Sequence, residues 1–137
     1  MIPNLMVTDM NRSVAFYRDV IGFTVEFAVD AHQQTRFDGG YADAVFTTLR
    51  LGDWQMMLQT RDSMVSDIPG ITAETPAHSS IALYLRDVDP SGVLDRAPEG
   101  TVLKGPERSW YGMLEVTVRD PDGYVITVGH PEGAAPS

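Results

Sequence analysis

The sequence predicts an α+β fold of two tandem βαβββ modules, whose curved mixed sheets surround a central cavity. Two observations carry this prediction. Several short segments alternate apolar and polar residues as half-buried strands do, and the order of these segments recurs in the second half of the chain. The length of 137 residues and the apolar share of 43% suit one globular domain with a real core. We expect one domain over 1–137, with module one at about 1–60, a linker at about 61–77 and module two at about 78–131.

The first module shows the pattern of a strand, a helix and three further strands. The expected strands are 2–7, 23–29, 44–50 and 54–60, and the expected helix covers about 10–21. Thr8-Asp9 supplies side-chain oxygens for the start of the helix, and Gly22 ends it. The polar stretch 30–43 is expected to be a loop, and Leu51-Gly52-Asp53 a short hairpin connection.

The second module repeats this order after a segment without sustained period. Residues 61–77 contain Pro69, Gly70 and Pro76, which favour a linker. The expected elements that follow are strand 81–86, helix 90–97, a brief strand 101–103, and strands 113–119 and 124–130. Asp120-Pro121-Asp122-Gly123 is typical of a turn, because Pro presets φ and Gly allows a positive φ.

The two halves can be laid on each other. Residues 2–9 match 80–87, since each is an apolar strand that ends in Asp at the same offset before a helix. Residues 49–58 match 119–128, each as strand, turn and strand. A repeated unit that cannot bury its sheet face alone must pair with its copy. Strand parity then assigns one set to the side packed against the helices: Met56, Leu58, Ile81, Leu83, Leu85, Tyr124 and Ile126, with Phe16, Tyr17 and Val20 nearby.

Composition excludes several classes of function. The net charge of -9, from 19 acidic and 10 basic residues, disfavours nucleic acid and anionic membranes and would attract a cationic partner. The chain has no cysteine, which rules out disulfides, thiolate catalysis and Cys-based metal sites. It shows neither an apolar run of the ~20 residues that span a bilayer nor a signal-peptide pattern at its start, so we expect a cytoplasmic protein.

Several motifs resemble the vicinal oxygen chelate superfamily, which includes glyoxalase I, the extradiol dioxygenases, the fosfomycin-resistance enzymes and the bleomycin-resistance proteins. They are Asn11-Arg12-Ser13-Val14-Ala15-Phe16-Tyr17, then Ile21-Gly22-Phe23, and Asp120-Pro121-Asp122-Gly123-Tyr124. The resemblance runs from Ile2 to about His130, and Trp110-Tyr111-Gly112-Met113 with Glu115 is most similar to the bleomycin-resistance branch. It implies a homodimer with ligand clefts shared between subunits.

The resemblance also implies where a metal would be bound. Enzymes of this superfamily hold a divalent ion with His, Glu or Gln at four pseudo-symmetric positions, which fall here on Ile2, Met57, Ser80 and Thr127. Such side chains are poor ligands for a hard or borderline cation. We therefore expect no metal and no other cofactor. A displaced site on His78 and Glu115 is an alternative, although two ligands fall short of the usual three or four.

Parity predicts the side chains that face the cavity. They form an apolar floor with scattered amides, hydroxyls and one carboxylate, and two aromatic residues on the loop before 113–119 could stack on a planar ligand. These two aromatics could equally cap the sheet edge or lie in a dimer interface. The candidate ligand-binding residues are Asn4, Met6, Gln55, Met57, Gln59, Ser80, Tyr84, Trp110, Tyr111, Glu115, Thr117 and Thr127.

These observations favour a binding role over catalysis. The sequence has no nucleophile-elbow motif, no phosphate loop and no second carboxylate to pair with Glu115, so we name no catalytic residue. We expect a small-molecule-binding protein of this superfamily that sequesters an aromatic or cationic compound. The alternatives are a metal-dependent lyase, isomerase or dioxygenase of the same superfamily with a displaced metal site, and an interaction domain whose cavity is filled by its own side chains. Pairing of the modules within one chain and exchange between subunits both fit the linker.

Overall fold

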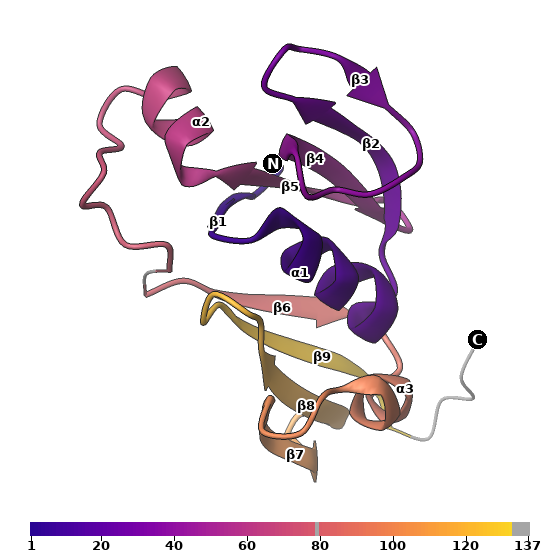
Figure 1. Cartoon of the computed structure of the whole chain (residues 1–137). Coiled ribbons are helices and arrows are strands. Elements are labelled where there is room, and N and C mark those ends of the chain that lie inside the picture. The colour runs from indigo at the N-terminus through magenta and orange to yellow at the C-terminus, as the bar shows by residue number, and fades with distance from the viewer. Residues whose placement is uncertain (79, 133–137) are drawn as a thin grey trace. The chain divides into compact units, whose positions relative to one another are not determined.

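The chain forms two compact units, Met1–Ser79 and Ser80–Ser137, in this computed structural model (Figure 1). The structure describes residues 1–78 and 80–132, so the last five residues of the predicted domain lie outside the described ones. No helix within the described ranges has the length and apolar character needed to cross a membrane.

Unit 1 contains a five-stranded sheet in the order β1-β5-β4-β2-β3. Its strands are β1 (Asn4–Val7), β2 (Thr24–Asp30), β3 (Thr35–Arg36), β4 (Ala44–Leu51) and β5 (Trp54–Thr60). β1 runs parallel to β5, and the other pairs are antiparallel. β2, β4 and β5 lie within one residue of the predicted strands, and β1 begins at Asn4, two residues later than predicted.

One helical segment covers unit 1, and its two ends follow the expected capping residues. α1 (Met10–Ala15) begins after Asp9, whose carboxylate accepts a hydrogen bond from the Arg12 backbone nitrogen at 3.1 Å. It continues as the π-helical turn η1 (Phe16–Ile21) and ends at Gly22, whose φ of 111° lies in the left-handed region. The π turn is not expected from the sequence, because apolar spacing does not distinguish i+4 from i+5 hydrogen bonding over a single turn.

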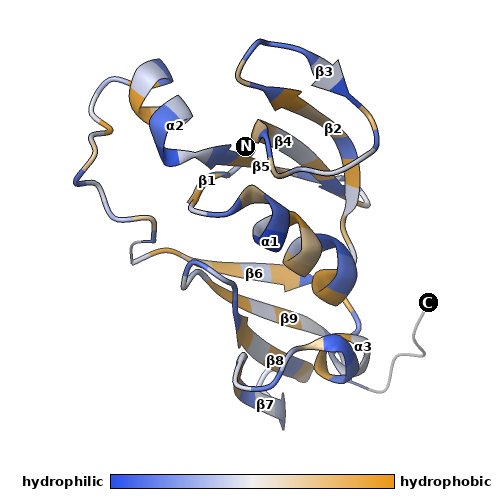
Figure 2. Cartoon of the chain, in the orientation of Figure 1, coloured by the Kyte–Doolittle hydropathy of each residue, from blue (hydrophilic) through white to orange (hydrophobic). Residues whose placement is uncertain are grey.

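The core of unit 1 lies between this helical segment and one face of the sheet. Met56 and Leu58 of β5 are buried on that face, as predicted. The Thr47 hydroxyl of β4 donates to the Met10 sulfur at 3.3 Å, which places the same face against α1. Figure 2 shows hydrophobic and hydrophilic residues alternating around α1, consistent with a helix that buries one side.

Two segments of unit 1 that were expected to be irregular contain short elements. The loop 30–43 includes β3, which is stabilised by polar contacts: the Asp30 carboxylate accepts the backbone nitrogens of His32 and Gln34. The linker 61–77 begins with α2 (Arg61–Asp67), which buries Met64. A strand of two residues and a helix with one buried anchor leave no periodic apolar pattern, so the sequence prediction missed both.

Unit 2 contains a four-stranded sheet in the order β6-β9-β8-β7. Its elements are β6 (Ala82–Arg86), α3 (Pro90–Arg96), β7 (Val102–Arg108), β8 (Met113–Arg119) and β9 (Val125–Pro131). β6 is parallel to β9, and the other pairs are antiparallel. The Asp89 carboxylate accepts the Ser91 backbone nitrogen at 3.0 Å and begins α3. The Asp120 carboxylate stabilises the predicted turn by accepting the backbone nitrogens of Asp122 and Tyr124.

The strand orders confirm the internal repeat, and the register corrects its alignment. Leaving out β3, both sheets run first, fourth, third and second strand of their unit. In unit 1 Asn4 faces Met57, whereas in unit 2 Tyr84 faces Thr127. Matching Met57 with Thr127, as the hairpins do, therefore equates Asn4 with Tyr84 and not with Ala82. The first strands had been aligned two residues out of step, a shift that preserves which face each residue occupies. The strands before the hairpin turn had been aligned one residue out of step, because the register matches Arg119 with Arg50 and not with Leu49.

Two expectations for unit 2 are wrong. β7 extends to Arg108 and does not stop at residue 103, because its second half is a polar edge strand with Gly105-Pro106 and register shifts, which hide the alternation. Ile81 is 64% exposed and precedes β6, so it does not belong to the core. Leu83 is half-buried, and the other residues predicted for the core of this unit are buried: Leu85, Tyr124 and Ile126.

Candidate ligand-binding site in unit 2

A pocket of about 170 Å³ opens on the sheet of unit 2. Its lining contains five of the predicted ligand-binding residues, together with two that sequence reasoning missed. The predicted ones are Tyr84, Tyr111, Glu115, Thr117 and Thr127, and the missed ones are Lys104 and Glu107. The two missed residues lie in the part of β7 that was not predicted. The Gly-Pro pair between them obscures the only available signal, which is the alternation of that edge strand.

The pocket follows from the strand register, which sets these residues side by side in two rows across the sheet. The first row, from β6 to β7, contains Tyr84, Thr127, Thr117 and Lys104. The second row, in the same order, contains Arg86, Gly129, Glu115 and Glu107. Alternate residues of a strand point to the same face, so both rows share one face of the sheet. Gly129 is the one member of these two rows without a side chain.

Gly129 allows Tyr84 to reach across the sheet. A Cβ atom on Gly129 would lie 2.7 Å from the Tyr84 Oη and 3.2 Å from the Glu115 Cγ. Real Cβ atoms essentially never approach other atoms as closely as the first distance. The space above Gly129 is therefore occupied by the Tyr84 phenol on its way to Glu115.

The Glu115 carboxylate is held by two phenols. The Oη atoms of Tyr84 and Tyr111 both donate to its Oε2 at 2.5 Å. Hydrogen bonds to a carboxylate are short and stronger than neutral ones. Partial burial, followed by the hydrogen bond to Glu115, raises the pKa of Tyr84 above its ordinary value, and the bond to Glu115 raises the pKa of Tyr111. Both phenols therefore stay protonated as donors at neutral pH. The other carboxylate oxygen, Oε1, accepts no hydrogen bond from the described residues.

The rest of the lining is paired within itself. The Lys104 Nζ lies 2.8 Å from the Glu107 Oε1, and this hydrogen bond raises the pKa of Lys104. The hydroxyls of Thr117 and Thr127 share one hydrogen bond of 2.8 Å. The lining thus carries one positive and two negative charges, and Glu115 provides the excess negative charge.

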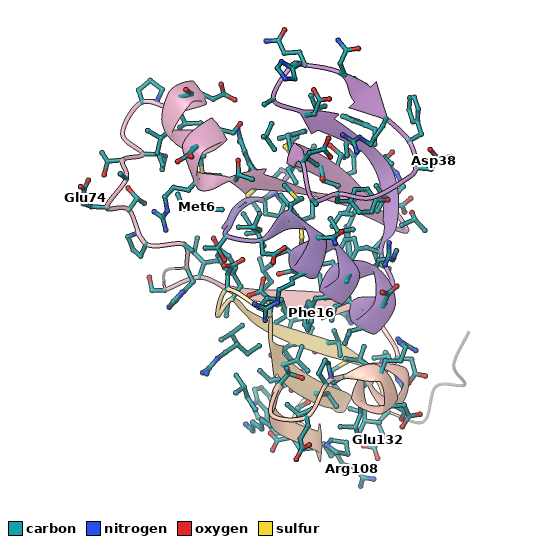
Figure 3. All side chains as sticks on the ribbon, in the orientation of Figure 1. Met6, Phe16, Asp38, Glu74, Arg108 and Glu132 are labelled. Carbon is teal, nitrogen blue, oxygen red and sulfur yellow. The ribbon has the colours of Figure 1, made fainter. Side chains whose placement is uncertain are left out.

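An aromatic hairpin borders the pocket between β7 and β8. Trp110 is 95% exposed, and its ring meets the Tyr111 ring edge-on with the centroids 5.3 Å apart. The hairpin is tied to the end of β9, because the Glu132 backbone nitrogen donates to the Gly112 carbonyl at 2.8 Å. Arg108 and Glu132, which form an ion pair, lie close together beside it (Figure 3). These contacts fix the base of the hairpin and leave the Trp110 ring in solvent.

The predicted residues of unit 1 form a different structure. The Asn4 amide donates to the Gln59 Oε1 at 2.8 Å, and the Gln59 Nε2 donates to Ser63 at 2.9 Å and to Asp67 at 2.8 Å. Gln55 donates to Glu26 at 2.8 Å. Met6 is buried and Met57 half-buried on the same sheet face. A wider pocket of about 720 Å³ lies beside this network, where Ser63 and Asp67 are part of its lining. The sequence prediction missed this pocket because it missed α2.

The four positions at which the resemblance implies metal ligands do not lie level with one another in either sheet. Met57 faces Asn4, two residues after Ile2. Thr127 faces Tyr84, whereas Ser80 is exposed, lies four residues before Tyr84 and precedes the start of β6, so it does not face Thr127. In the part of the chain that the structure describes, no three His, Asp or Glu side chains gather as a metal-binding group. His78, proposed as a displaced ligand, is exposed in unit 1, and Glu115 belongs to unit 2.

Comparisons with known proteins agree with this fold. A family model described as Glyoxalase/Bleomycin resistance protein/Dioxygenase superfamily matches residues 3–128. A protein of unknown function from Agrobacterium tumefaciens str. C58 has a similar structure, with a TM-score of 0.68, 24% identity, and 94% of this chain and 90% of that chain covered. The structure of TioX from Micromonospora sp. ML1 has a TM-score of 0.66 and 16% identity, with 96% of this chain and 97% of that chain covered. A glyoxalase/bleomycin resistance protein/dioxygenase family enzyme from Burkholderia phytofirmans PsJN has a TM-score of 0.66 and 17% identity, with 93% of this chain and 94% of that chain covered. Such identities show a shared fold alone, and no curated protein matches the chain.

Proposed function

Because this chain belongs to the Glyoxalase/Bleomycin resistance protein/Dioxygenase superfamily, we propose that it is a metal-independent small-molecule-binding protein that takes an aromatic or cationic compound at the unit 2 pocket. One observation carries the proposal. Two phenols hold one oxygen of the Glu115 carboxylate at the pocket, and the described residues leave its other oxygen without a hydrogen bond.

The phenol clamp suits binding because it fixes the carboxylate before a ligand arrives. An acceptor already held in place loses little side-chain freedom on binding, which lowers the cost of association. A small set of convergent polar groups is also what orients ligands in known sites. The aromatic hairpin beside the pocket offers Trp110 as a surface for a planar group.

Metal independence is the second part of the proposal and rests on donor chemistry. Ile2 has no donor atom, and Met57 offers only a thioether, which hard cations disfavour. The Thr127 hydroxyl already shares a hydrogen bond with Thr117. This donor set does not fit the divalent ion that the superfamily's enzymes use, so we derive no reaction step through a metal.

The groups around the pocket also suit binding better than catalysis. Its lining holds neither histidine nor cysteine. The two phenols have raised pKa values, so they donate hydrogen bonds and do not act as bases at neutral pH. Within the pocket lining, Glu115 and Glu107 are the only carboxylates, and Glu107 is paired with Lys104.

Thermal denaturation of the chelator-treated protein tests the proposal, with a panel of aromatic and cationic compounds added. A compound that binds only the native state should raise the melting temperature. At a concentration about one hundred times its Kd it adds about 2.7 kcal/mol to the free energy of unfolding. The variant Glu115→Gln should lose this stabilisation. Failure of every aromatic and cationic compound to stabilise the wild type would overturn the proposal. Stoichiometric Zn, Ni, Mn or Fe in freshly purified protein would instead favour the metal-dependent lyase, isomerase or dioxygenase.

The homodimer implied by the resemblance is part of the same proposal. Light scattering should then give twice the 15.1 kDa mass of the chain. A single-chain mass at micromolar concentration would contradict it. If the exposed Trp110 is instead an interface residue, Trp110→Ala should lower the dimer fraction and leave binding of small cations unchanged.

A further inference from the structure

We infer that the unit 2 pocket is a head-group site for a primary ammonium, and that the aromatic remainder of the ligand lies outside it against Trp110. The inference rests on the proposed function of this pocket and specifies its ligand. It joins three observations: the small volume, the arrangement of acceptors and the exposed aromatic hairpin.

The volume limits what can enter. The pocket measures about 170 Å³, whereas sites for drug-sized ligands measure roughly 300–1,000 Å³. A water molecule takes up about 30 Å³ of liquid, so the pocket has room for about five or six waters. It therefore accommodates a small polar head group and leaves the body of a larger ligand outside.

The acceptors favour a group with several N–H donors. The free Oε1 of Glu115 can accept one hydrogen bond. The hydroxyls of Thr117 and Thr127 share one hydrogen bond, so oxygen lone pairs remain beside it. Glu115 lies two residues from Thr117 on β8, in the adjacent row of the same face. A primary ammonium has three N–H donors and can bond to the carboxylate and the hydroxyls together, whereas a quaternary ammonium has none.

The charges favour a cation over an anion. The only cation in the lining is Lys104, and Glu107 offsets its charge at 2.8 Å. An anion would meet the Glu115 carboxylate, whose two phenol donors are already engaged. The net charge of -9 on the chain would also attract cations from a distance.

The hairpin determines where the rest of the ligand would lie. Tyr111 links the two parts of the site, because its hydroxyl donates to Glu115 and its ring contacts Trp110. A ligand with a short chain between its ammonium and an aromatic ring can therefore place the ring on Trp110. Such a ligand is an arylalkylamine.

Calorimetry with three matched probes tests this inference in the full-length protein. The probes are 2-phenylethylammonium, its N,N,N-trimethyl counterpart and 3-phenylpropionate, which keep the ring and vary the head group. We expect the primary ammonium to bind at least about tenfold more tightly than the trimethyl compound, which corresponds to about 1.4 kcal/mol, and the carboxylate not to bind. Glu115→Gln should weaken the primary ammonium at least tenfold, and the control Glu99→Gln, which removes an exposed carboxylate outside the pocket, should change nothing.

A second variant keeps the test decisive if Glu115→Gln unfolds the protein. Thr127→Val should weaken binding of the primary ammonium severalfold and leave the trimethyl compound unchanged, because only the former can use the hydroxyl. Equal affinity for both cations, reduced in both by Glu115→Gln, would overturn the primary-ammonium inference and leave the proposed cation-binding function standing. Absence of binding by all three probes and by the wider panel would overturn the proposed function itself.

Discussion

The two units share one strand order but differ at the center of the equivalent sheet face. By strand register, Gln59 of unit 1 occupies the position of Gly129 in unit 2, and Phe46 occupies that of Glu115. In unit 1 the Gln59 amide fills the center and bonds to Asn4, Ser63 and Asp67. In unit 2 the glycine leaves that center open for Tyr84, which reaches Glu115. The repeat therefore specifies the framework, and single substitutions within it decide which unit carries a carboxylate pocket.

The same comparison explains an unusual hydroxyl in unit 1. Thr48 and Thr117 occupy equivalent positions, facing Met57 and Thr127 respectively. Thr117 bonds to the hydroxyl opposite, at 2.8 Å. Thr48 is buried and its hydroxyl has no hydrogen-bond partner among the described residues, because the thioether opposite it is a weak acceptor. The threonine hydroxyl at this position therefore has a hydrogen-bond partner in unit 2 and none among the described residues in unit 1.

The largest effect on binding and stability is expected from placing a side chain at Gly129 of unit 2. Gly129→Ala should move Tyr84 away from Glu115, abolish binding of small ammonium compounds and destabilise the protein by about 1–3 kcal/mol through overpacking. Urea denaturation and calorimetry measure both changes. Gly40→Ala is the matched control, since a Cβ at Gly40 has no atom within 4 Å and its φ is not in the left-handed region. Equal effects of the two substitutions on binding and on stability would contradict the role assigned to Gly129.

Substitution by valine should affect stability differently at the two equivalent threonines, Thr48 and Thr117. Thr117→Val removes a hydrogen bond and should destabilise the protein by about 1 kcal/mol. Thr48→Val removes a buried hydroxyl without a partner and should leave stability unchanged or raise it by up to about 1 kcal/mol. Chemical denaturation of the two variants side by side measures the difference. Destabilisation of the same size in both would show that the hydroxyls are in equivalent environments after all.

The smallest expected effect is on alkaline stability. The pKa of Tyr84 is raised in the folded state above its ordinary value of 10.0. The folded protein then keeps a proton that the unfolded chain releases, so this contribution to stability is full below about pH 10 and is lost as pH rises toward the folded pKa. Chemical denaturation between about pH 9 and 11, the range around the ordinary pKa of a phenol, should show the free energy of unfolding falling with pH. The fall should be shallower in Tyr84→Phe than in the wild type. An identical slope in both proteins would contradict the clamp on Glu115.

Sequence reasoning predicted the parts of this structure that depend on residue alternation. Strands β5 and β8 begin and end where the pattern places them, and parity put Tyr84, Glu115 and Thr127 on one face. This works because period-two alternation is a direct consequence of strand geometry. The five predicted residues that line the pocket all come from that reasoning or from the aromatic hairpin.

The remaining features depend on information that one-dimensional patterns lack. Gly129 leaves room for the Tyr84 phenol by having no side chain, and its importance emerges only when the fold brings the Tyr84 Oη and the Glu115 side chain close to it. Lys104 and Glu107 lie on an edge strand whose register shifts disturb the alternation. Ser80 was grouped with Thr127 because the first strands of the repeat were aligned two residues out of step.

A crystal structure of the chelator-treated protein with 2-phenylethylammonium would show whether the ammonium group binds at Glu115. We expect the ammonium nitrogen within about 3 Å of the Glu115 Oε1, with both phenols still bonded to Oε2. A compound bound away from Glu115, or a metal ion coordinated by that carboxylate, would contradict it.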